Sequence, residues 1–208
     1  MRTSPVKGAT MICSEALQLI LAAEGMNQPG AWPGGSSGIT LGIGYDLGYV
    51  TVDQFESDWG ACLNKNARER LRAVVGLTGL KARNRAAALA DIRIKRADAD
   101  KVFERRTLPK CEFQTAQTFP GYERLPQEVQ GALVSLVYNR GCSMVDRPGE
   151  DRRREMRAIR DAVAARDLQK IADQLRSMKR LWQGQKLDGL IARREAEADL
   201  VEEAIQTA

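Results

Sequence analysis

The sequence contains no histidine among its 208 residues. A Ser-His-Asp triad and a Cys-His hydrolase both need an imidazole to carry a proton, so both classes of hydrolase are excluded. A catalytic zinc ion held by histidine is excluded for the same reason. Glycosidases, by contrast, can work with carboxylates alone. We therefore expect an activity that needs no metal and no other cofactor.

The sequence also lacks long apolar runs and paired cysteines. No stretch approaches the roughly 20 apolar residues that a membrane-spanning helix needs. Residues 1–25 hold only a short apolar patch with Glu15 and Glu24 at its edges, which makes a poor secretory signal. The four cysteines form no CxxC pair, so a zinc knuckle or a redox motif is not expected. Whether any of these cysteines pair is left open by their spacing.

The chain is basic, but its charges are mixed. Its formal net charge is +5, from 32 Lys and Arg against 27 Asp and Glu, and its hydrophobic fraction of 43% is that of a globular protein. A basic balance favours nucleic acid, anionic membranes or anionic cell-wall polymers as partners, although a solvated helical surface explains it equally well. The interspersed acidic residues and the lack of a recognised motif argue against a nucleic-acid-binding protein.

The first predicted helix places a carboxylate on an apolar face. Ser14 is a good N-cap, and Leu17, Ile20, Leu21 and Glu24 follow at helical spacing before a glycine that ends the helix. Burial disfavours the charged form of a carboxyl group, and a carboxyl group that stays protonated near neutral pH can protonate a glycosidic oxygen. The alternative is a glutamate that pairs with an arginine or lies solvated in the last turn.

A glycine-rich segment after this helix predicts a tight hairpin. Residues 26–38 have loop composition, and residues 39–48 alternate apolar side chains with Thr, Gly and Asp, which is the period of a β-strand. Thr40 and Asp46 share the face that is not apolar. In a fully extended strand these two residues would lie roughly 20 Å apart. The chain must therefore bend at Gly42-Ile43-Gly44 if both residues serve one bond.

The rest of the chain is predicted to be mainly helical, without internal repeats. The predicted helices span residues 51–75, 80–91, 98–106, 126–140, 154–166, 168–182 and 188–206, with a loop at 109–125 and an exposed connection at 143–153. This pattern predicts a mainly α-helical α+β protein. We expect a single domain over residues 1–208, with one lobe of about 14–75 that contains the hairpin and a helical lobe of about 76–208.

Three blocks of the sequence resemble one known superfamily. AEG, a glycine-rich loop and GITLGIGYDLG resemble the catalytic signature of the phage-lysozyme and pesticin superfamily, in which a helix ends in Glu-Gly and a hairpin has the form Thr-x-Gly-x-Gly. LPQEVQGALVSLVYNRG resembles its central helix, which ends in Tyr/Phe-Asn-x-Gly, and GLIARREAEADL resembles its final helix. The blocks occur in the expected order and span most of the chain.

This resemblance implies a lysozyme-like fold with a small β-hairpin lobe and a larger helical lobe. It also implies a muramidase that cleaves the β-1,4 bond between N-acetylmuramic acid and N-acetylglucosamine in bacterial peptidoglycan. Glu24 then corresponds to the catalytic acid and Thr40 to the hairpin threonine. Many phage lysozymes carry an Asp in the loop before the hairpin, whereas the loop here reads AWPGGSSG. Asp46, in the GYDLG context of the pesticin-like branch, is therefore the candidate second carboxylate.

The role of Asp46 has three alternatives. It can orient water as a general base with Thr40, it can stabilise positive charge in the transition state, or it can cap a glycine-rich turn. Three further residues are predicted to bind substrate. Trp32 and Tyr45 can stack on sugar rings or belong to the core, and Asn139 can hydrogen-bond substrate or cap its helix.

Other functions are considered beside the muramidase. A lytic transglycosylase also uses one glutamate but forms an anhydro sugar without water, and a wall-binding module without activity would need neither Glu24 nor Thr40. The basic run Arg152-Arg153-Arg154 can contact an anionic outer envelope or form a solvated helix face. We expect a monomer that is made in the cytoplasm without a signal peptide and acts on the wall in the periplasm, as a phage endolysin or a delivered toxin.

Overall fold

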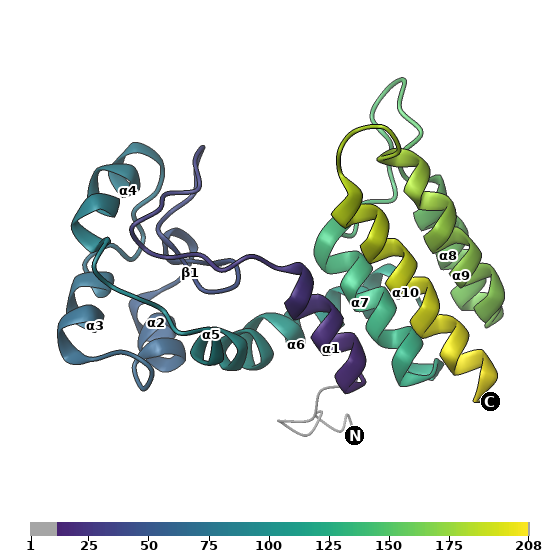
Figure 1. Ribbon diagram of the computed structural model, residues 1–208, viewed down its shortest axis with the longest axis horizontal. Coiled ribbons are helices and arrows are strands. Elements are labelled where there is room, and N and C mark those ends of the chain that lie inside the picture. The colour runs from purple at the N-terminus through teal and green to yellow at the C-terminus, as the bar shows by residue number, and fades with distance from the viewer. Residues whose placement is uncertain (1–11, 208) are drawn as a thin grey trace, which may run out of the picture. The chain divides into compact units, whose positions relative to one another are not determined.

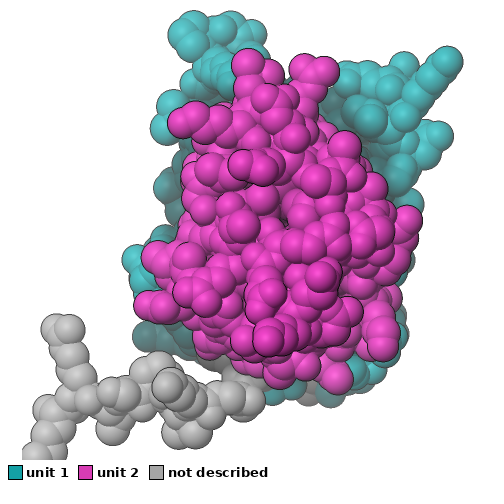
Figure 2. All heavy atoms as spheres, turned by 90° about the vertical axis from the view of Figure 1, so that its left-hand side faces the viewer, with its two compact units in different colours: residues 1–23, 108–208 teal, residues 24–107 magenta. Residues whose placement is uncertain are grey.

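The computed structural model describes residues 12–207 and divides them into two units (Figure 1, Figure 2). One unit is the continuous stretch Glu24–Thr107 and contains the hairpin, and we call it the hairpin unit. The other combines the described residues before Glu24 with those from Leu108 onward, and we call it the helical unit. The mainly helical α+β class expected from the sequence, with a small antiparallel hairpin, is confirmed.

The hairpin unit contains a two-stranded antiparallel sheet and short helices. Its elements are β1 (Thr40–Leu41), β2 (Tyr45–Asp46), the 3-10 turn η1 (Leu47–Tyr49), α2 (Val52–Trp59), α3 (Lys65–Arg72), α4 (Gly79–Ala86), η2 (Ala87–Leu89), α5 (Arg96–Val102) and the π-helical η3 (Phe103–Thr107). The capping box predicted for α2 is present, because Thr51 Oγ1 accepts from Gln54 N and the Gln54 side chain accepts from Thr51 N.

The apolar face of the hairpin lies in the core of its unit. The alternating residues of this face are all buried, as the period of two predicted: Ile39, Leu41, Ile43, Tyr45 and Leu47. Phe55 and Trp59 of α2 are buried with them. Burying one such side chain contributes about 1.5–3 kcal/mol, so this face holds the register of the hairpin.

The prediction of one helix over residues 51–75 is wrong. The chain leaves the helical conformation after Trp59 and resumes it at Lys65. Asn64 accounts for the new start, because its Oδ1 accepts a hydrogen bond from Ala67 N at 2.8 Å and thereby caps α3. The apolar periodicity continues across the break, which is why the pattern alone did not reveal it.

The helical unit is a packed group of helices. Its elements are α1 (Ser14–Ala23), α6 (Leu108–Thr118), the 3-10 turn η4 (Tyr122–Arg124), α7 (Gln127–Arg140), α8 (Arg154–Ala165), α9 (Leu168–Ser177), the 3-10 turn η5 (Met178–Leu181) and α10 (Asp188–Gln206). α10 packs on α1, α7 and α9, and α8 packs on α9 (Figure 1). No helix within the described residues is both long and apolar enough to span a bilayer.

α7 is the central helix of the helical unit, as the sequence predicted. Every residue from Val129 to Val137 is buried, so this helix is enclosed on all sides. α1 packs closely on it, because a Cβ at Gly131 would lie only 2.1 Å from the Cβ of Ala16. A side chain at position 131 would push the two helices apart, and the glycine is therefore required by packing.

The prediction of a loop over residues 109–125 is also wrong, because α6 occupies Leu108–Thr118. Pro109 lies in the continuous helical stretch formed by α5, η3 and α6, just after the π-helical turn η3, where the regular i to i−4 hydrogen-bond pattern is already interrupted. The polar composition of this segment predicted a loop, but its residues up to Thr118 form a helix with few apolar side chains. The helix ends before Gly121, which has a positive φ of 98°.

A buried network of charged side chains joins α7 to α10. Glu197 Oε1 accepts from Ser135 Oγ and from Arg194 Nη2, each at 2.6 Å. Burial raises the pKa of Glu197 and lowers the pKa of Arg194, and their contact opposes both shifts. Removing one member of such a pair leaves a buried unpaired charge and costs about 3–5 kcal/mol. The charged motif GLIARREAEADL is therefore part of the core as well as of the surface.

The border between the two units differs from the one predicted near residue 75. α1 belongs to the helical unit, and residues 76–107 belong to the hairpin unit. Gly79 N, for example, donates to Ser37 O at 3.0 Å and ties the start of α4 to the loop before the hairpin. Such contacts join segments that are distant in sequence, and no local sequence pattern predicts them.

Candidate active site

The hairpin has the tight geometry that the candidate site requires. β1 and β2 pair antiparallel with Thr40 opposite Asp46. The turn is made by Gly42 and Gly44, whose φ values are +52° and +66°. Directly opposed residues in such a pair have Cβ atoms about 4.5–5.5 Å apart and point to the same face. The predicted bend is confirmed, and it places Thr40, which is buried, opposite Asp46.

The segment that carries Glu24 is tied to the tip of this hairpin. α1 ends at Ala23, so Glu24 is the first residue after the helix and is partly exposed. Three residues later, Asn27 N donates to Gly42 O at 2.7 Å and Gly42 N donates to Asn27 O at 2.9 Å. Three residues span at most roughly 11 Å. The backbone of Glu24 is therefore held close to the tip of the hairpin. No sequence pattern marks Asn27 as a site residue.

Asp46 holds the hairpin together through backbone hydrogen bonds. Its Oδ1 accepts from Gly48 N at 2.8 Å and from Gly38 N at 2.9 Å, and its Oδ2 accepts from Gly38 N at 3.1 Å. The carboxylate thus caps η1 and anchors the residue that precedes the hairpin. Asp46 therefore acts as a cap in this structure. Because a carboxylate offers about four acceptor positions, Oδ2 also keeps one for a water molecule.

Three further hydrogen bonds hold the loop before the hairpin. Trp32 Nε1 donates to Ser37 O at 2.9 Å, and Tyr49 Oη donates to Ser36 O at 2.9 Å. Gly79 N donates to the same Ser37 O. The indole N–H of Trp32 therefore serves the loop itself, while its ring is partly exposed. Stacking of Trp32 on a sugar ring stays a prediction.

Tyr45 has the environment of a core residue. It is buried, its Oη donates to Asp58 Oδ2 at 2.8 Å, and its ring meets Trp59 edge to face at a centroid distance of 5.8 Å. Burial, followed by the hydrogen bond to Asp58, raises the pKa of Tyr45. This environment favours the core alternative over a sugar-binding platform. The period of two also places Tyr45 on the apolar face of the hairpin.

Asn139 belongs to the helical unit. It is partly exposed and lies one residue before the end of α7. The helix end is completed by Gly141, which has a φ of 72° and donates its N–H to Val137 O at 2.7 Å. A side-chain cap from Asn139 is therefore not needed to end the helix. Its predicted contact with substrate stays a prediction.

Asp46→Asn is expected to lower turnover by about 10²-fold or more, because an amide cannot take a proton from water. The melting temperature should fall by a few degrees. The side-chain N–H₂ of asparagine would face the Gly38 N–H, and it cannot accept the hydrogen bond that Asp46 Oδ2 accepts. Turnover on purified cell wall and thermal unfolding measure the two effects on one preparation. Turnover close to that of the unmodified protein, with the same small loss of stability, would remove Asp46 from the mechanism and leave it as a cap.

Within the described residues, no cluster of three or more His, Cys, Asp or Glu side chains could hold a metal ion. The family model described as phage lysozyme matches residues 62–197. No curated protein matches the chain significantly. Asn139 lies inside the matched stretch, whereas Glu24, Thr40 and Asp46 precede it. Assignment of these three residues therefore depends on their sequence motif and on the hairpin geometry described above.

Proposed function

Because the chain belongs to the phage lysozyme family and is thus a peptidoglycan-lytic protein of the lysozyme type, we propose that it is a muramidase with Glu24 as general acid. The bond cleaved is the β-1,4 linkage between N-acetylmuramic acid and N-acetylglucosamine. The observation that supports this proposal best is the pairing of Thr40 with Asp46, on a hairpin whose tip is hydrogen-bonded to the segment that follows Glu24.

The proposed reaction uses one proton donor and one water molecule. Glu24 gives its proton to the glycosidic oxygen while the bond from that oxygen to the anomeric carbon breaks. The Thr40 hydroxyl and Asp46 Oδ2 hold the water that attacks the anomeric carbon. Asp46 takes the proton that this water loses, and the outcome is inversion at the anomeric carbon. NMR detection of the first anomer formed tests this outcome, and retention would contradict it.

The proposal includes the place of action. The protein is made in the cytoplasm and acts as a monomer on the wall from the periplasmic side, as an endolysin or as a delivered toxin. Its net charge of +5 suits an anionic cell envelope.

Digestion of purified peptidoglycan, followed by mass analysis of the soluble products, tests the proposed reaction. We expect muropeptides with reducing ends at N-acetylmuramic acid, and equal yields with and without EDTA. A lytic transglycosylase would instead release products that are each lighter by one water molecule. Products cut only within the peptide stems, or strong inhibition by EDTA, would contradict the proposal.

A further inference from the structure

Three segments of the hairpin unit that lack charged residues come together beside the hairpin. They comprise residues 31–38, 47–51 and 76–80. The whole chain, by contrast, is 28% charged. Ser37 O accepts hydrogen bonds from Trp32 Nε1 at 2.9 Å and from Gly79 N at 3.0 Å. Gly76 N donates to Leu47 O at 2.9 Å. We call the surface that these three segments form the neutral patch.

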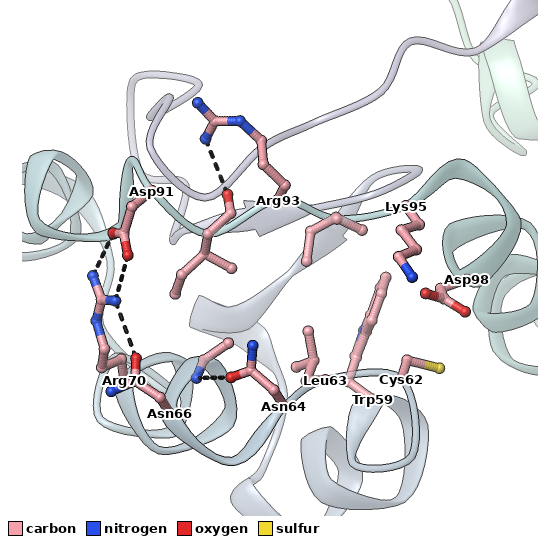
Figure 3. Close-up of a pocket in the computed structure, with 13 residues that line it drawn as sticks. Trp59, Cys62, Leu63, Asn64, Asn66, Arg70, Asp91, Arg93, Lys95 and Asp98 are labelled. Atoms are coloured by element: carbon pink, nitrogen blue, oxygen red, sulfur yellow. Dashed lines mark hydrogen bonds and ion pairs between the residues drawn. The ribbon is translucent and has the colours of Figure 1, made fainter.

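The neutral patch differs in its chemistry from the cavity of the same unit that Figure 3 shows. That cavity has a volume of about 420 Å³, and charged side chains lie at both of its ends. Arg70 and Asp91 lie at one end, and Lys95 and Asp98 lie at the other (Figure 3). No residue of the neutral patch lines the cavity. A ligand of the neutral patch, unlike one of the cavity, needs no charge of its own.

Tyr49 presents an aromatic ring to solvent in the neutral patch. It is 66% exposed, and its hydroxyl donates to Ser36 O at 2.9 Å. This hydrogen bond restrains the side chain, so a ligand that binds to the ring has less side-chain entropy to overcome. Leu80, which follows Gly79 in the patch, is 67% exposed. Exposed aromatic and aliphatic side chains of this kind are found at binding surfaces.

The neutral patch also contains hydroxyl groups that are available to a ligand. Ser36 and Ser37 accept hydrogen bonds through their carbonyl oxygens, and their side-chain hydroxyls have no partner within residues 12–207. Each hydroxyl can both donate and accept. An aromatic ring with neutral hydroxyls beside it matches a pyranose, which has C–H groups on its faces and hydroxyl groups at its rim. A nucleic acid or an anionic lipid would meet no opposite charge in this patch.

The neutral patch adjoins the candidate active site. The Asp46 carboxylate accepts hydrogen bonds from Gly38 N and Gly48 N. Ser37 precedes the first of these glycines, and Tyr49 follows the second. The two glycines are in close contact, because a Cβ at Gly48 would lie 3.0 Å from Gly38 Cα. A glycan strand bound at Asp46 can therefore extend onto the patch.

We propose that the neutral patch binds an uncharged N-acetylhexosamine ring of the glycan strand, beyond the two sugars whose linkage is cleaved. The sugar ring stacks on Tyr49, and its hydroxyl or acetamido groups form hydrogen bonds with the hydroxyls of Ser36 and Ser37. The inference rests on the proposed function, which makes the glycan strand the substrate. It gives Tyr49 a role in substrate binding that the cleavage reaction itself does not require.

NMR titration of the full-length protein with tetra-N-acetylchitotetraose, an uncharged glycan without peptide, tests this inference. We expect saturable shifts at the amides of Ser36, Ser37 and Tyr49, and nuclear Overhauser effects between the Tyr49 ring protons and sugar C–H groups. Tyr49→Ala should weaken binding by about two- to tenfold. Tyr49→Phe keeps the ring and should bind within about twofold of the unmodified protein.

Phe113→Ala is the matched control, because Phe113 is an aromatic residue of the helical unit that is 67% exposed. It should bind the tetramer as the unmodified protein does. Absence of the shifts or of the Overhauser effects at Tyr49, or equal binding by a folded Tyr49→Ala variant, would overturn the inference. Equal weakening by Phe113→Ala would also overturn it, because the loss would not be specific to the neutral patch. The tetramer contains no N-acetylmuramic acid and the titration measures binding alone, so its failure is distinct from a failure of the muramidase proposal.

Discussion

Replacement of Glu24 by glutamine is expected to lower muramidase turnover by about 10²–10⁴-fold or more, since glutamine has the same shape but cannot supply a proton. Neither hairpin residue can replace Glu24 as the proton donor. The Asp46 carboxylate accepts backbone hydrogen bonds, and the Thr40 hydroxyl has no proton of suitable acidity. The melting temperature should change little or rise, because glutamine fills the same volume and a catalytic carboxylate is not selected for stability.

Release of soluble muropeptides by equal amounts of folded protein measures this effect. Glu15→Gln is the matched control, since Glu15 is an exposed glutamate of the first turn of α1 and plays no part in the proposed reaction. The control should retain full turnover. A folded Glu24→Gln protein with nearly normal turnover would show that another group supplies the proton.

The second large effect is expected at Gly38, where alanine should disturb both the fold and the activity. A Cβ there would lie 2.3 Å from Gly48 N and 2.4 Å from Asp46 Oδ1, so backbone atoms must move. Overpacking of this kind costs about 1–3 kcal/mol. The movement would also displace the side chains of the hairpin, and a displacement of about 1 Å at a reacting group can cost about 10²-fold in rate.

Thermal unfolding and turnover together measure the Gly38→Ala effect. Gly189→Ala is the matched control, because a Cβ at Gly189 meets no atom within 4 Å and this glycine lies within α10. In a helix, alanine is favoured over glycine by up to about 1 kcal/mol, so the control should be as stable or more stable. If Gly38→Ala left both the melting temperature and turnover unchanged, the close contact between the loop and Asp46 would not be needed for function.

The sequence predicted those parts of the fold and the site that depend on short-range patterns. The period of two in residues 39–48 predicted the hairpin, and the glycines between Thr40 and Asp46 predicted the bend that pairs them. The apolar residues of α7 predicted a central helix. These features were accessible because the residues that cause them are neighbours in the chain.

Features that depend on tertiary contacts were not accessible in this way. Gly38 approaches Gly48 and Asp46 closely, whereas Gly34 and Gly35 meet no atom within 4 Å, and the fold alone creates this difference. Arg194 and Glu197 lie in the motif GLIARREAEADL, and nothing in their spacing shows that Ser135 lies opposite them. The helix break before Asn64 depends on one side-chain hydrogen bond, which competes with an unbroken apolar period. In each case a distant or single contact outweighs the local pattern.

The way the chain is divided between the two units has a consequence for biosynthesis. The hairpin unit is one continuous stretch, so all of its residues are present once Thr107 has left the ribosome. α1 is made earlier, but it packs on α7 and α10, and α10 is the last helix among the described residues. At about 5–20 residues per second, roughly 10–40 seconds pass between the synthesis of α1 and that of α10. During translation its apolar side chains are exposed, so chaperone binding to nascent chains should concentrate on α1 and end when α10 emerges.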